Sequence, residues 1–182
     1  MIRLYKAGEL QKDVLDLILL NCQVPRERLS DLRAQMAANR VGVQRFQALC
    51  AKYGTAVVLG AGEALLDYAE RKMRAGIAAM PDGTYRFEDV FDNPEIEGVL
   101  PIAVTITIAG DEMRLHFDSA PQVRAGINMT YTALLATTYY MVKSVVDPTI
   151  LPNAGLARPL TVTAPEGTIL NCRHPAAVNG RV

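Results

Sequence analysis

Apolar residues recur at helical spacing through the N-terminal part of this chain, and the spacing predicts three consecutive helices. The first includes residues 10–18, and the second spans residues 25–53, with residue 30 as an alternative start. Gly54 follows as a C-terminal cap, because glycine accepts a left-handed backbone. The third helix runs from residue 55 to about residue 80, where Pro81-Asp82-Gly83 supplies strong turn chemistry.

Glycines interrupt the third predicted helix at positions 60, 62 and 76. Each lowers the helix propensity by up to about 1 kcal/mol relative to alanine. A glycine in a helix also leaves room for a neighbouring backbone. We therefore expect another segment of chain to approach this helix closely.

The pattern then changes to alternation of apolar and polar positions, which predicts β-strands. Residues 84–89 alternate, and residues 101–109 form the clearest strand. Gly110-Asp111 is a hairpin turn signal, and residues 112–118 form the return strand. On that strand His116 and Asp118 are predicted to point away from the core.

Residues 125–142 carry no charged side chain but several threonines and tyrosines. Hydroxyl groups are costly in lipid, so we interpret this segment as a helix buried inside the protein and not as a membrane span. Asn128 or Thr130 caps its start, and it ends before Asp147-Pro148.

The order of these elements predicts an α+β fold. It would contain N-terminal antiparallel helices, a central antiparallel β-hairpin or sheet packed on a long buried helix, and short C-terminal strands. Those last strands are expected at residues 160–164 and 168–170. We expect a helical segment over residues 1–80 and an α+β segment over residues 81–182.

Composition excludes several classes of protein. The chain has 182 residues, with 19 lysines and arginines balanced by 19 aspartates and glutamates, so it lacks the positive charge of a nucleic-acid-binding protein. Cys22, Cys50 and Cys172 are far apart and have neither zinc-site nor disulfide-framework spacing. These features, and the lack of a signal-peptide pattern at Met1, predict reduced thiols and a cytoplasmic protein.

Several acidic residues could carry acid–base chemistry, but a structural interpretation is favoured for them. They flank turns and a strand end, at Asp82, Glu88, Asp89 and Asp92. His116 and Asp118 share a strand face, yet two such ligands need a third before a metal can bind. No metal site is therefore assigned within this chain.

Polar residues in two turn-rich segments are the better candidates for substrate binding. Asn128 lies at a predicted helix start, where backbone N–H groups can face an anion. Asn153 and Arg158 lie in the loop after the uncharged helix, and a guanidinium can hold a carboxylate through two parallel hydrogen bonds. The alternative is that these residues build a rigid corner by satisfying backbone groups.

Sequence blocks along nearly the whole chain resemble an internal stretch of the hydantoinase B/oxoprolinase family. Their order and spacing carry the resemblance more than any one block does. The blocks are Val24–Gln35, Leu66–Arg74, Pro81–Tyr85, Phe117–Asn128, Pro152–Pro159 and Ala164–Asn171.

This resemblance implies that the chain is a central fragment of a longer subunit of an ATP-dependent enzyme. The parent enzyme would hydrolyse a cyclic amide such as 5-oxoproline, a hydantoin or an N-methylhydantoin. A hydantoinase A-like ATPase subunit would use the ATP, and the parent would hold a divalent metal. The fragment itself would have no cofactor and no catalytic activity, and the enzyme would be a homo- or hetero-oligomer.

The chain departs from the family pattern in two ways. It lacks the His/Asp-rich stretch that resembles a metal site in family members, and it has His116-Phe117-Asp118-Ser119-Ala120 where they usually have Asp-Phe-Thr-Gly-Ser. Two alternatives stay open. One is a fragment of an acetone carboxylase-type large subunit, and the other is a packing and assembly module that binds no ligand.

Overall fold

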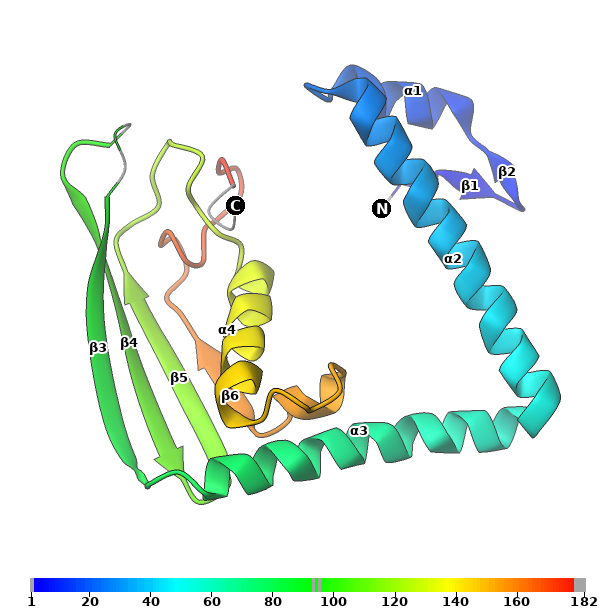
Figure 1. Ribbon diagram of the computed structural model, residues 1–182. Helices are drawn as coiled ribbons and strands as arrows, with labels where there is room; N and C mark the ends of the chain where they lie inside the picture. Colours follow the sequence, from blue (N-terminus) through cyan, green and yellow to red (C-terminus); the bar gives the residue numbers. More distant parts are fainter. Residues whose placement is uncertain (1, 93, 95, 179–182) are drawn as a thin grey trace. The chain divides into compact units, whose positions relative to one another are not determined.

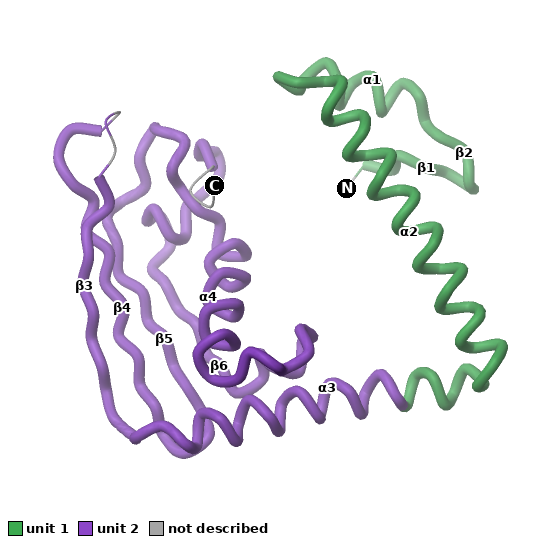
Figure 2. Tube along the Cα trace, in the orientation of Figure 1, with its two compact units in different colours: residues 1–60 green, residues 61–182 purple. Residues whose placement is uncertain are grey.

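The computed structural model describes residues 2–92, 94 and 96–178 (Figure 1). They form two compact units, residues 1–60 and residues 61–182 (Figure 2). One helix, α3 (Thr55–Ala78), begins in the first unit and continues into the second. The α+β class is confirmed, whereas the division expected after residue 80 stays a prediction.

The first unit contains a small β-hairpin and two helices. Strands β1 (Tyr5–Lys6) and β2 (Glu9–Leu10) pair antiparallel. The turn between them has positive φ at both Ala7 and Gly8, the backbone that a tight hairpin requires. This hairpin was not predicted, because two-residue strands are too short to show alternation.

The helices of the first unit follow their predicted signals. Helix α1 spans Lys12–Leu20, and α2 spans Pro25–Tyr53 with proline in its first turn. Gly54 ends α2 with a φ of 85°, as predicted for a glycine cap. Helix α1 packs against α2.

Helix α3 contributes its C-terminal half to the core of the second unit, where Ala69, Met73 and Ile77 are buried. The close approach expected at its glycines occurs at Gly76, where the Val146 side chain leaves no room for a Cβ atom. Gly60 and Gly62 have no neighbouring atom within 4 Å of the position a Cβ would take.

The second unit is built on a four-stranded sheet in the order β3–β4–β5–β6. Strands β3 (Gly83–Asp92), β4 (Val99–Ala109) and β5 (Glu112–Ser119) form an antiparallel meander, while β6 (Leu160–Thr163) pairs parallel with β5. The strand predicted at residues 168–170 is wrong. Thr168 forms only isolated bridges, to Pro121 and Asn171.

Helix α4 (Tyr131–Val146) lies across one face of the sheet (Figure 1). Thr130 caps its start by accepting a hydrogen bond from the Ala133 N–H at 3.3 Å, as one of the two predicted caps. The predicted burial of this helix holds along one stripe, whereas Tyr140 and Val145 on its other side are each 68% exposed. The uncharged sequence does not distinguish a covered face from an uncovered one.

The main core of the second unit lies between the sheet, α3 and α4. The short 3-10 helix η1 (Ala154–Ala157) follows α4 and buries Leu156 in the same core. No single helix in the described part of the chain has both the length and the apolar composition to cross a membrane, although α2 and α3 taken as a broken pair pass on those two criteria.

Candidate functional site

Asn128 lies at the centre of a loop junction and is completely buried. Its Oδ1 accepts a hydrogen bond from the Val123 N–H at 2.9 Å. Its Nδ2 donates to the carbonyl oxygens of Val123, Ala125 and Ala177, at 2.7, 3.1 and 2.9 Å. The amide therefore closes its own loop and joins it to the C-terminal segment, and all of these contacts are to backbone groups.

Asn153 caps η1 and joins it to α3. Its Oδ1 accepts a hydrogen bond from the Gly155 N–H at 2.9 Å, and its Nδ2 donates to the Leu65 carbonyl at 3.2 Å. Gly155 itself lies so close to the Leu66 carbonyl that a Cβ atom would have no space. The loop after α4 is therefore pressed against α3.

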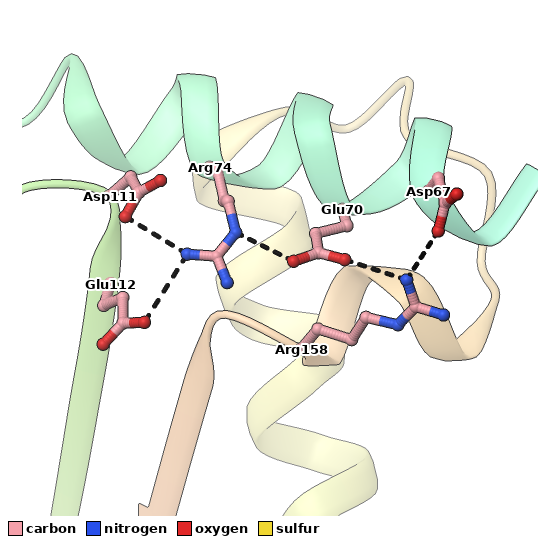
Figure 3. Close-up of polar contacts among 6 residues, drawn as sticks. All are labelled: Asp67, Glu70, Arg74, Asp111, Glu112 and Arg158. Atoms are coloured by element: carbon pink, nitrogen blue, oxygen red, sulfur yellow. Dashed lines mark hydrogen bonds and ion pairs between the residues drawn. The ribbon is translucent and has the colours of Figure 1, made fainter.

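Arg158 completes the same contact through charge. Its Nη1 donates to Asp67 Oδ1 at 2.8 Å and to Glu70 Oε2 at 2.9 Å, both on α3 (Figure 3). The hydrogen bond from Arg158, together with a second from Arg74, holds the pKa of the Glu70 carboxyl below its ordinary value. Arg158 does bind carboxylates, as its side-chain geometry predicts, but here they belong to the protein.

Arg74 extends this network to the sheet. Its Nε donates to Glu70 Oε1 at 2.9 Å, and its Nη1 lies 3.1 Å from Asp111 and 3.6 Å from Glu112 at the β4–β5 turn (Figure 3). These acids raise the pKa of the Arg74 guanidinium, with the Glu70 hydrogen bond as the largest cause. Alternating charges thus connect the η1 loop, α3 and the hairpin.

The three predicted substrate-binding residues therefore have distinct positions. Asn153 and Arg158 are brought together against α3, whereas Asn128 joins different loops. Arg158 keeps 39% of its side chain exposed, while Asn128 is fully enclosed. Their role in substrate binding stays a prediction.

A polar hollow of about 680 Å³ lies where β3 and β5 end and β4 begins. Its charged and hydroxyl lining comes from Arg86, Glu88, Asp89, Asp118 and Ser119. Arg86 and Glu88 pair at 2.8 Å. The Ser119 hydroxyl is buried and has no hydrogen-bond partner among the described residues. The lining offers donors and acceptors for a small polar molecule.

Some residues of this hollow were noted in the sequence, but not as a group. Glu88, Asp89 and Asp118 were noted on separate strands, and strand register places Glu88 and Asp118 on either side of Ala103. Ser119 and Arg86 were missed. The departure from the family pattern around Phe117 was the signal that marked this corner.

His116 and Asp118 do not form a metal site here. His116 Nε2 lies 3.4 Å from Asp118 Oδ1, and His116 Nδ1 lies 2.8 Å from Thr163 Oγ1. Across the residues that the structure describes, no group of three or more histidine, cysteine, aspartate or glutamate side chains is arranged to hold a metal ion. These residues do not fit the divalent metal expected of a parent enzyme.

Comparison with known proteins matches the whole chain. The family model described as Hydantoinase B/oxoprolinase matches residues 1–182. A candidate B subunit of a D-/L-hydantoinase, from Pseudomonas sp. (strain NS671), is 32% identical over 99% of this chain and 33% of its own length. The beta subunit of the caprolactamase from Pseudomonas jessenii is 32% identical over 96% of this chain and 30% of its own length.

A solved structure has the same fold. The ATP-dependent caprolactamase from Pseudomonas jessenii matches 98% of this chain and 31% of its own chain, with a TM-score of 0.82 and 29% identity. The present chain spans about a third of the length of the curated relatives it matches most strongly.

Proposed function

This chain belongs to the hydantoinase B/oxoprolinase family, and from that premise we propose that it forms the central part of one subunit of an enzyme that hydrolyses a cyclic amide with ATP. The match over residues 1–182 carries the proposal. The names of its relatives support the substrate class, since hydantoinase and caprolactamase act on ring amides. The name of the related solved structure supports the use of ATP.

The proposed chemistry explains why such an enzyme would need ATP. A cyclic amide is a poor electrophile, and phosphorylation of its oxygen would make attack by water on the ring carbonyl feasible. In this proposal a hydantoinase A-like partner subunit uses the ATP. A divalent metal is held outside this chain, because the described residues have no arrangement that fits one.

The chain's own role in the proposal is to provide a framework. Asn128, Asn153 and the charged network through Arg158 hold loops and helices in place. We expect the 182-residue chain alone to hydrolyse no cyclic amide. A role in assembly is a second proposal, favoured by the large apolar side chains exposed on α2 and α4.

The test uses the full-length subunit that contains this chain, purified with its ATPase partner. The substrates are caprolactam, hydantoin, N-methylhydantoin and 5-oxoproline, and the assay measures ring-opened product together with ADP. We expect one of these rings to open only when ATP is present. Ring opening at an equal rate without ATP, or ATP turnover that no ring stimulates, would contradict the proposal.

Arg158 is the predicted contact that can be tested most directly. Arg158→Ala removes a possible substrate contact and the ion pairs to α3, whereas Asp67→Asn weakens an ion pair and keeps the guanidinium. If Arg158 binds a substrate carboxylate, KM rises about tenfold or more in Arg158→Ala but not in Asp67→Asn. Unchanged turnover and KM in Arg158→Ala, with only a lowered Tm, would remove it from the substrate contacts.

A further inference from the structure

Helix α2 carries an apolar stripe with alternating steps of three and four residues, the spacing of a coiled-coil seam. The stripe consists of Leu29, Leu32, Met36, Asn39, Val43, Phe46, Cys50 and Tyr53. The helix is continuous over this whole range. One face of α2 is therefore shaped for a second helix along most of its length.

The chain's own first unit covers only the beginning of this stripe. Helix α1 packs against α2, and Leu29, Leu32 and Met36 are half-buried. Further along, Val43 is 57% exposed and Phe46 is 48% exposed. The uncovered half of α2, residues 39–53, continues an interface that α1 has already begun.

A hollow of about 510 Å³ lies where the covered half of the stripe meets the uncovered half. Tyr5 and Gly8 of the N-terminal hairpin line one side, and Met36 and Val43 of the stripe line the other. A side chain from a docked helix can enter this hollow. Asn39 also lines it and gives that position of the seam a polar group, which fixes the register of a partner helix.

The charge around the uncovered half has one sign. Between Asp31 and Glu63 the chain has four cations and no acid, the cations being Arg33, Arg40, Arg45 and Lys52. None of the four forms an ion pair with another described residue. By contrast α1, which covers the first half, carries Asp13 and Asp16.

These charges decide which occupant fits. Two copies of α2 placed seam to seam would bring arginines together with no acid to compensate them, which is unfavourable in either direction. A helix that combines an apolar stripe with acidic flanks matches both features, as α1 already does. The printed names of the relatives are those of one subunit among several, so another subunit must have a surface to contact.

We propose that the uncovered half of α2, residues 39–53, docks an acidic amphipathic helix of the partner ATPase subunit. This inference rests on the proposed function, which supplies that subunit. The docked helix lays apolar side chains along Val43, Phe46 and Tyr53, and its carboxylates face Arg40 and Arg45. Seam packing provides most of the affinity, and the charges provide orientation and specificity.

Site-specific crosslinking tests which molecule covers the seam. The photoreactive residue benzoylphenylalanine replaces Phe46 in the full-length subunit, which is purified with its co-expressed ATPase partner and irradiated. The control places it at Ala48, on the opposite face of the helix. We expect crosslinks to an acidic helix of the partner from position 46 only. Crosslinks to a second copy or to another segment of the same subunit, or none, would overturn the proposal.

A pair of charge substitutions measures the contribution of the seam. Phe46→Asp should weaken association with the partner subunit at least about tenfold, while Ala48→Asp should leave it unchanged. Both positions are exposed on a helix, so circular dichroism should report intact folding in both variants. Equal affinities in the two variants would contradict the docking surface.

The activity of the unsubstituted complex separates this inference from the proposed function. If the complex opens a cyclic amide with ATP but position 46 crosslinks elsewhere, the docking surface is wrong and the function stands. If position 46 crosslinks to an acidic helix of the partner but no ring opens, the function is wrong and the docking surface stands.

Discussion

Asp147 joins the end of α4 to α3 through a compact set of polar contacts. Its Oδ2 pairs with Lys72 Nζ at 2.7 Å, and its Oδ1 accepts hydrogen bonds from the Thr149 N–H at 2.8 Å and the Thr149 hydroxyl at 2.6 Å. The Lys72 contact first, and the Thr149 contacts next, lower the pKa of Asp147 from its ordinary 3.8 to about 2. The folded protein therefore favours the ionised carboxylate.

This shift predicts how stability depends on pH. A carboxyl whose pKa is depressed on folding stabilises the folded state above its unfolded pKa, and that contribution is lost as pH falls toward the folded pKa of about 2. The Tm of the wild-type chain should therefore exceed that of Asp147→Asn near neutral pH, and the difference should shrink below about pH 4. Thermal unfolding of both chains across this range is the measurement. A difference independent of pH would contradict the assignment.

Asn128 should be the most sensitive of the described asparagines, because its amide satisfies a buried backbone donor and three carbonyls. Asn128→Ala should lower the free energy of unfolding by about 3 kcal/mol. Asn128→Asp should cost more, since a carboxylate would face those carbonyls. Asn171→Ala, which removes one hydrogen bond to Ala164, is the control and should cost about 1 kcal/mol. Urea titration gives all three values.

The polar residues chosen from the sequence do make specific contacts, but their partners could not be predicted. Asn128, Asn153 and Arg158 were selected as loop residues with chemical potential. Their contacts depend on Ala177, Leu65 and Asp67, which are 49, 88 and 91 residues away. No local pattern reports such distances along the chain, so their structural duties appear only in the folded molecule.

At the scale of elements, the contact between η1 and α3 depends on a missing side chain. Gly155→Ala would push a Cβ atom into the Leu66 carbonyl, which is backbone and cannot rotate away. We expect a loss of about 1–3 kcal/mol in the free energy of unfolding. Gly62→Ala is the matched control in α3. It has open space and should gain up to about 1 kcal/mol. Equal effects in the two variants would argue against the close approach.

The elements that sequence patterns predicted well are those with local punctuation. Pro25 and Gly54 bound α2, and Thr130 and Asp147 bound α4. The parallel pairing of β6 with β5 could not be predicted, because register between distant strands depends on how α4 crosses the sheet. Residues 168–170 have strand-like composition but form only bridges, since neighbouring backbone in loops takes their hydrogen bonds.

At the scale of the molecule, the second unit leaves an apolar groove open between α4 and the sheet. The groove has a volume of about 510 Å³ and is lined entirely by apolar surface and two threonines, with Met80, Val104 and Ile106 on one side and Met141 and Val145 on the other. An apolar groove of this size exposed to water favours association with another surface. The chain on its own should therefore self-associate.

Substitution on the rim of the groove tests this association. Val145→Lys places a charge at a side chain that is 68% exposed, so it should reduce self-association with little change in stability. Ser144→Lys adds the same charge at an exposed position that does not line the groove, and it should leave self-association unchanged. Light scattering at increasing concentration compares the two. A monomeric wild-type chain at high concentration would contradict the expectation.

The strand order also sets the sequence in which the sheet can be completed during synthesis. The meander of β3, β4 and β5 pairs neighbours along the chain and can close as soon as Ser119 has left the ribosome. The far edge of β5 must wait for Leu160–Thr163, after α4 and η1 have been made. A nascent chain halted between these points presents an open strand edge to its surroundings, so translation speed through residues 120–163 governs how long that edge is unprotected.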